Sequence, residues 1–216
     1  MDFKKVTFLL IVSFTASLLI RTTGTLFPQV FQNVYAVKLT VITNVFFIGV
    51  QGLFYICFLR EYTANRKRSL KTACWLSIIG TFLVAVIYLK NACLVFGLNI
   101  FPLFLMNRYF ETLIPLLSAF FFLLFFVTFK KVQSQWEYKT LNRPISSAII
   151  GSVIFVIHHL VVLTNLFISH TFNRLEHMHR DVAVGTIPLI VLAAVLILHF
   201  YFRFFQYQQS KPMGVK

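Results

Sequence analysis

Two adjacent histidines, His158 and His159, lie within an apolar run that is long enough to cross a membrane. An ionisable side chain at that depth is costly, so such residues usually line a ligand or ion pathway or find a polar partner on a neighbouring helix. A neutral imidazole can form hydrogen bonds, bind a metal or accept a proton. The pair is therefore the strongest candidate for chemistry in the chain.

Small and polar residues recur around this pair at intervals of seven. Residues seven apart nearly overlie on a helix of about 3.6 residues per turn, and a stripe of this kind faces other helices. The stripe reads Ser146-Ser147, Gly151-Ser152, His158-His159 and Asn165. We predict a binding pocket lined by Ser152, His158, His159 and Asn165. The alternative is a packing face whose imidazoles form hydrogen bonds with a neighbouring helix.

A second polar cluster, Arg108 and Glu111, falls at the outer mouth of the fourth apolar run. The two side chains are three positions apart, which favours an ion pair on one helix face. Both residues also belong to the predicted ligand-binding set, as contacts near the entrance of the pocket.

The remaining histidines allow two cofactor hypotheses. On a continuous helix, His170, His177 and Asp181 would share one face, and with His179 they could bind zinc or copper on the outer side. A haem between His158 and His199 requires similar depths, but along their helices the two differ by ~9 Å. We expect no cofactor, with haem and a transition metal as the alternatives.

The five residues Ile157-His-His-Leu-Val161 resemble the paired-histidine stretch of the TLC-domain family, which includes ceramide synthases. A further His-Asp pair follows within a later span in that family. The nearest counterpart here, His179-Arg-Asp181, falls in a predicted loop and is interrupted by Arg180. The resemblance implies a membrane enzyme that acts on a lipid or acyl substrate, with His158 and His159 as catalytic base.

The composition indicates a polytopic integral membrane protein, because 58% of the 216 residues are hydrophobic and only 12% are charged. Six apolar runs predict an all-α, six-helix bundle that forms a single membrane domain over residues 1–216. The first run could be a cleaved signal peptide, but no small-x-small site follows it, so we predict an uncleaved signal anchor. The runs span residues 6–20, 39–59, 73–89, 112–129, 145–169 and 182–204.

Two outer connections are themselves apolar. Residues 26–34 have the periodicity of an interfacial amphipathic helix, and residues 91–110 form a run that is re-entrant or lies flat on the membrane. We therefore expect the outer face of the bundle to be partly covered.

The net charge of +14 is distributed unevenly. With six spans, fourteen of the twenty Lys and Arg residues fall on the side that holds both termini, so both termini are predicted to be cytoplasmic, in a plasma or inner membrane. The basic loops predict contacts with anionic lipid headgroups rather than with nucleic acid.

None of the six Asp and Glu residues falls near the middle of a span, which argues against a carboxylate-coupled pump or a paired-carboxylate hydrolase. We predict non-enzymatic ligand binding, for small-solute transport or membrane-embedded sensing with a partner membrane or signalling subunit. The alternatives are the lipid or acyl enzyme and a structural, assembly or immunity subunit without a pocket.

Overall fold

The computed structural model describes residues 2–27, 29, 34–63, 68–98, 108–133, 139–172 and 177–210. Within these ranges, side chains are described at all positions except 25, 108, 139, 169–172 and 177–184. Every regular element in this part of the chain is helical, as the sequence predicted.

The described residues form six long helices and the short 3₁₀ helix η3. The six long helices are each long and apolar enough to cross a membrane, which confirms the predicted number and type of elements. Each predicted apolar run falls within one helix, and every helix extends beyond its run at both ends. They are α1 (Phe3–Leu26), α2 (Val34–Tyr62), α3 (Arg68–Val95), α4 (Arg108–Gln133), η3 (Lys139–Leu141), α5 (Asn142–Phe172) and α6 (His177–Ser210).

The two apolar outer connections are largely absorbed by the helices or fall outside the described residues. Leu26 is the last residue of α1, and Val34 is the first residue of α2. The segment 91–95, predicted as the start of a re-entrant run, belongs to α3 instead. That helix ends at Val95, and Gly97 follows in a turn with a φ of 78°, which suits a residue without a side chain; the Leu98 amide donates to the Cys93 carbonyl at 2.7 Å.

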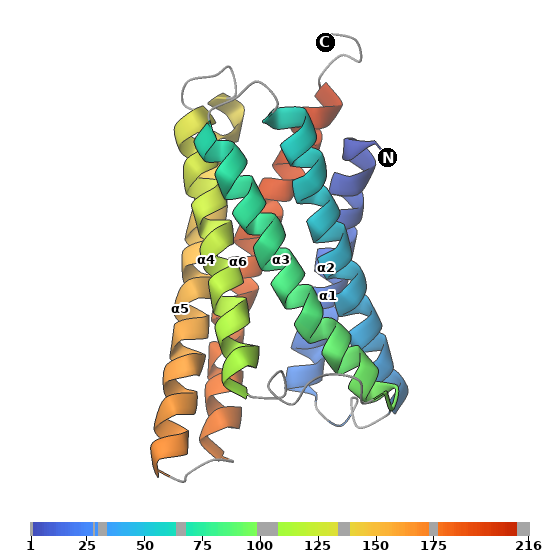
Figure 1. Cartoon of the computed structure of the whole chain (residues 1–216), viewed down its shortest axis with the longest axis vertical. Helices are drawn as coiled ribbons and strands as arrows, with labels where there is room; N and C mark the ends of the chain where they lie inside the picture. The colour runs from blue at the N-terminus through green and yellow to red at the C-terminus, as the bar shows by residue number, and fades with distance from the viewer. Residues whose placement is uncertain are drawn as a thin grey trace.

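The helices form a closed ring in chain order. Each helix packs against the helices before and after it, and α6 packs back against α1 (Figure 1). Successive helices alternate in direction, so both termini lie at the same end of the bundle (Figure 1). We call this end the termini end.

The half of the bundle nearest the termini is filled by an aromatic cluster, which we call the aromatic plug. Its rings come from α1, α2, α4 and α6. Four of them contact Phe58 edge-on or tilted, with centroids 5.0–6.4 Å apart: Phe3, Phe125, Phe129 and Phe204. The plug consists of Phe3, Phe54, Phe58, Tyr62, Phe125, Phe129, Phe200 and Phe204, all of them buried.

Two glycines allow close helix contacts. A Cβ added at Gly151 of α5 would lie 2.6 Å from the Ala193 carbonyl oxygen of α6. At Gly80 of α3 it would lie 3.1 Å from the Ser118 hydroxyl of α4. Small residues at such crossings let backbones approach closely, as is common between membrane helices.

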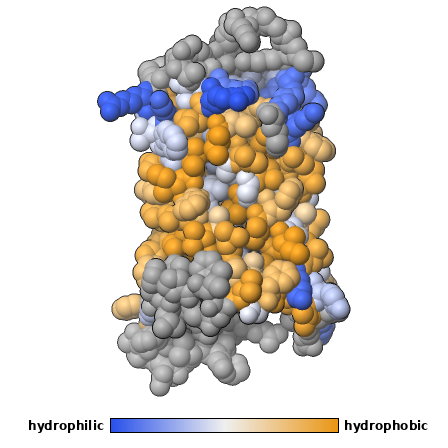
Figure 2. Space-filling view, turned by 45° about the vertical axis from the view of Figure 1, so that its right-hand side comes forward, coloured by the Kyte–Doolittle hydropathy of each residue, from blue (hydrophilic) through white to orange (hydrophobic). Residues whose placement is uncertain are grey.

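The outer surface of the ring is apolar. Large hydrophobic side chains are exposed on all six long helices, among them Phe8, Phe46, Phe82, Phe120 and Phe167. Figure 2 shows a broad hydrophobic belt with hydrophilic residues gathered at the termini end. This pattern is typical of a surface in contact with lipid tails, with the polar side chains at the edge of the bilayer.

Candidate functional site

A cavity of about 540 Å³ lies inside the ring, and residues from all six long helices line it. Its volume is within the range of small-molecule binding sites. The lining extends from the end of the bundle that faces away from the termini to beyond its middle, where Tyr55, Phe126 and Tyr201 meet the aromatic plug.

The floor of the cavity is formed by Tyr55 of α2 and Tyr201 of α6, both fully buried. Their hydroxyl oxygens are 3.5 Å apart. Phe122 stacks on Tyr55 from the cavity side, with ring centroids 5.5 Å apart and an interplanar angle of 9°. The plug ring of Phe125 contacts Tyr55 edge-on at 5.0 Å, so the floor rests directly on the plug.

The cavity is long and narrow. Its lining on α2 extends from Tyr55 to Thr40, and on α6 from Tyr201 to Ile187. At 1.5 Å per residue these stretches correspond to roughly 20 Å along the bundle. Two prolines occur at the level of the cavity: Pro115 of α4 lines it, and Pro188 of α6 follows the lining residue Ile187. Each removes one backbone hydrogen bond and favours a bend that opens space.

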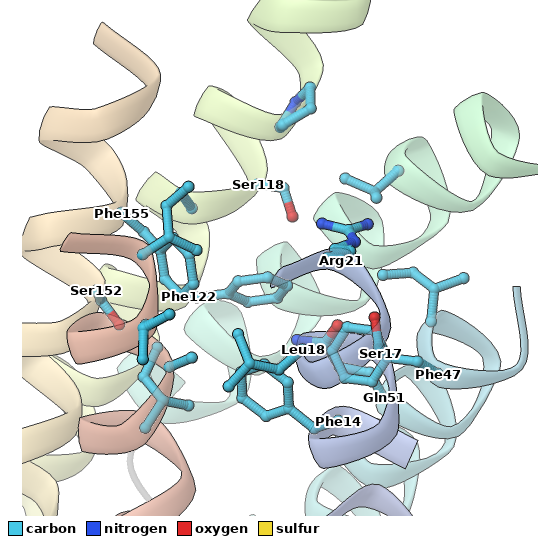
Figure 3. A pocket seen from close by; sticks show the side chains of 18 of the residues that line it. Phe14, Ser17, Leu18, Arg21, Phe47, Gln51, Ser118, Phe122, Ser152 and Phe155 are labelled. Atoms are coloured by element: carbon cyan, nitrogen blue, oxygen red, sulfur yellow. The ribbon is translucent and has the colours of Figure 1, made fainter. Parts of the chain in front are cut away.

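The walls are mainly aromatic and aliphatic. Phe14 of α1 and Phe47 of α2 stack with their centroids 5.0 Å apart on one side. Phe122 and Phe155 stand on the other side, from α4 and α5, and Figure 3 shows these rings around the central space. A ligand in this space would be surrounded mostly by carbon.

Arg21 of α1 brings a positive charge to the cavity wall. Its Nε donates a hydrogen bond to Asn44 Oδ1 at 3.1 Å, and the same oxygen accepts a hydrogen bond from Ser17 Oγ at 2.7 Å. The guanidinium carbon lies 5.2 Å from the centre of the Tyr88 ring, within cation–π range. These contacts from α2 and α3 fix the guanidinium, which points toward the cavity in Figure 3.

Two buried hydroxyls, Ser118 of α4 and Ser152 of α5, also belong to the lining. They are 2% and 1% exposed, and neither Oγ has a hydrogen-bond partner. Figure 3 shows both oxygens directed toward the cavity. An unsatisfied buried hydroxyl costs about 1–3 kcal/mol, so a ligand that supplied a hydrogen bond there would remove this cost.

The predicted histidine pair is divided between two environments. His159 lines the cavity, and its Nδ1 lies 2.8 Å from the Phe155 carbonyl oxygen. Because a carbonyl only accepts, Nδ1 is the donor, and Nε2 of the neutral ring is then an acceptor. The His158 ring contacts that of His159 at 5.1 Å, but His158 is not among the lining residues and its Nδ1 has no hydrogen-bond partner.

The other predicted pocket residues also separate. Ser152 lines the cavity, as predicted, whereas Asn165 is buried outside the lining, with its amide nitrogen lacking a hydrogen-bond partner. Glu111 is outside the lining too, and it forms an ion pair with Lys90 of α3 rather than serving the cavity. The predicted pairing of Glu111 with Arg108 involves a side chain that lies outside those described.

The proposed outer metal site cannot be built from the described side chains. Those of His170, His177, His179 and Asp181 all lie outside the described set. Among the residues whose side chains are described, no three His, Cys, Asp or Glu residues come close enough to hold a metal ion. His199 is exposed on α6 and does not line the cavity.

Arg21 was not among the predicted site residues, because the first apolar run was ended at Ile20. The structure continues α1 to Leu26, which places Arg21 inside a helix rather than in a loop. A signal was present in the sequence: Leu10, Phe14, Ser17 and Arg21 follow at i, i+4, i+7 and i+11, which is one helix face. Phe14, Ser17 and Arg21 all line the cavity.

Comparison with known proteins gives no assignment: no family model, no curated protein and no solved structure matches the chain.

Proposed function

We propose that the chain is an integral membrane protein that binds a small, largely apolar molecule inside its helix bundle. The cavity carries this proposal, because a ring of six helices encloses about 540 Å³ that no side chain of the described residues fills. A subunit that served only to pack against a partner would have no need of such a space, since interiors are normally close-packed.

The basic residues support an orientation. Fourteen of the twenty Lys and Arg residues belong to the termini side, which supports a cytoplasmic location for that side and contacts with anionic lipid headgroups. The cavity then extends from the outer side to beyond the middle of the membrane. The ligand enters from the outside or from the outer leaflet, and the aromatic plug separates it from the cytoplasm.

Binding is the step that transport and sensing share. A carrier would have to open the plug to release its cargo, whereas a sensing module would only change the packing of its helices. A catalytic role for the histidine pair finds less support, because His159 lines the cavity and His158 does not. We therefore favour ligand binding over catalysis.

The proposal is tested by identifying what co-purifies with the protein. Val191 of α6 lines the cavity, so Val191→Trp should fill part of it. Val195, one turn further along, is 52% exposed, so Val195→Trp places the same side chain on the outer surface. Mass spectrometry of extracts from the purified wild type and both variants should find one species in the wild type and in Val195→Trp, and at least tenfold less in Val191→Trp.

Equal amounts of every extracted species in the three proteins would contradict the proposal. So would a wild-type preparation without any bound molecule other than bulk lipid. Both variants are first compared with the wild type by size-exclusion chromatography, so that a loss of ligand is not confused with a loss of fold.

A further inference from the structure

The charge on the cavity wall narrows the class of ligand. Among the lining residues in the described part of the chain, Arg21 carries the only formal charge, and no lining residue is an Asp or Glu. The surrounding wall is mostly carbon, and in such an environment electrostatic interactions are much stronger than in water. A ligand with a negative group at this position would be favoured over a neutral or cationic one.

The geometry around Arg21 suits a planar anion. Asn44 holds the Nε of the guanidinium and Tyr88 lies against the group, so its orientation is fixed from two neighbouring helices. A fixed guanidinium presents a fork of N–H donors, which matches a carboxylate by two parallel hydrogen bonds.

The position of Arg21 along the bundle defines where the head of the ligand would lie. It is three residues from Gly24, the outermost lining residue of α1, and seven residues from Phe14, the deepest. The head therefore belongs near the outer end, and the apolar space continues beyond it to Tyr55 and Tyr201. The length of this space, roughly 15–20 Å, is close to half of the ~30 Å hydrocarbon core and so to one lipid tail.

We infer that the ligand is a single-chain carboxylate, whose head pairs with Arg21 and whose apolar chain extends between the phenylalanine rings toward the tyrosine floor. This inference rests on the proposed binding function and specifies its substrate class. A two-chain phospholipid is the main competing anion, but a cavity of about 540 Å³ matches a drug-sized molecule with one chain rather than two.

The test compares head groups on a constant chain. Wild-type protein in phosphatidylcholine nanodiscs is equilibrated with radiolabelled dodecanoate, and unlabelled dodecanoate, dodecanol and dodecylamine are used as competitors. The inference predicts saturable binding, with dodecanol and dodecylamine at least tenfold weaker than dodecanoate, because a hydrogen-bonded charge pair contributes about that factor or more. Equal competition by the three compounds, or a preference for the amine, would overturn it, and this arm requires no variant.

Variants locate the head. Arg21→Gln should weaken dodecanoate binding at least tenfold and leave dodecanol binding within about twofold, while Arg21→Lys, which keeps the charge without the fork, should lie between them. Unchanged binding of dodecanoate to Arg21→Gln would overturn the inference. Nanodiscs that also contain phosphatidylglycerol separate the two anion sources, since displacement of dodecanoate by this lipid would identify a phospholipid headgroup as the natural occupant and refute the single-chain assignment.

The failure of this inference is distinguishable from the failure of the proposed function. If Val191→Trp loses its co-purifying species while Arg21→Gln binds dodecanoate as the wild type does, the cavity is a ligand site and only the carboxylate class is wrong. If dodecanoate binds equally well to Val191→Trp and wild type, it binds outside the cavity and the inference fails, whatever the co-purification shows.

Discussion

The contact between α5 and α6 at Gly151 gives a quantitative prediction about the bundle. A methyl group at this position would lie 2.6 Å from the Ala193 carbonyl oxygen, 3.0 Å from Ile197 Cγ1 and 3.2 Å from Leu196 Cβ. The nearest of these atoms is helix backbone, so α6 must move as a unit to relieve the overlap. Forced overpacking of this kind costs about 1–3 kcal/mol, and the backbone contact places Gly151→Ala at the upper end of that range.

A matched control comes from Gly49 of α2, where an added Cβ would meet nothing within 4 Å. Both substitutions exchange Gly for Ala inside a helix, which by itself favours the helix by about 1 kcal/mol. The difference between the two variants therefore isolates the packing cost at Gly151, about 2–3 kcal/mol. For a chain of this size that corresponds to a difference of roughly 4–12 °C in the midpoint of thermal unfolding.

The assay is thermal unfolding of both variants and the wild type in the same detergent, with the folded fraction followed by size-exclusion chromatography. We expect Gly49→Ala to match or exceed the stability of the wild type and Gly151→Ala to unfold at a lower temperature. If the two variants unfolded at the same temperature, α5 and α6 would not cross at Gly151 as described, and the ring closure that shapes the cavity would be wrong.

Three further predictions concern the plug, the ion pair and the serines. Phe58→Ala should destabilise the bundle by about 3–5 kcal/mol, measured by the same unfolding assay, because it removes a fully buried ring from the centre of the plug. Glu111→Ala should lower the melting temperature more than Lys90→Met does. The Lys90 side chain is 3% exposed and that of Glu111 36%, so Glu111→Ala leaves a buried ammonium without that carboxylate. Equal melting temperatures of the two variants would contradict this prediction. The double substitution Ser118→Ala, Ser152→Ala should leave the fold intact, because it removes two unsatisfied hydroxyls. If the ligand forms hydrogen bonds with these hydroxyls, quantitative mass spectrometry of the extracted ligand should show a several-fold lower occupancy in this variant.

The helices were predictable because hydropathy and length alone distinguish a membrane-spanning helix from other elements. The ends were less predictable. The segment Arg21-Thr22-Thr23-Gly24 interrupts the apolar run and was expected to lie outside the first span, yet α1 continues through it to Leu26. A polar residue need not end a membrane helix when its side chain can point into a cavity. The presence of the cavity could not be predicted from the sequence.

The site was predictable only in part, for a geometric reason. His158 and His159 are adjacent and therefore point about 100° apart on a helix, and in the structure only His159 reaches the cavity. Ser152 and His159 fall on the cavity side, and His158 and Asn165 do not. Which part of the stripe faced the interior depended on how α5 sits between α4 and α6, and this follows from contacts such as Gly151 with Ala193 that span distant parts of the chain.

The most direct test of the central claim is an experimental structure of the purified protein crystallised in a lipidic mesophase. We predict non-protein density inside the ring, between Arg21 near the outer end and the Tyr55–Tyr201 floor, with the aromatic plug closed beneath it. Two results would contradict the account: a structure in which the six helices pack together without a cavity, and a structure in which protein side chains fill the position of the cavity.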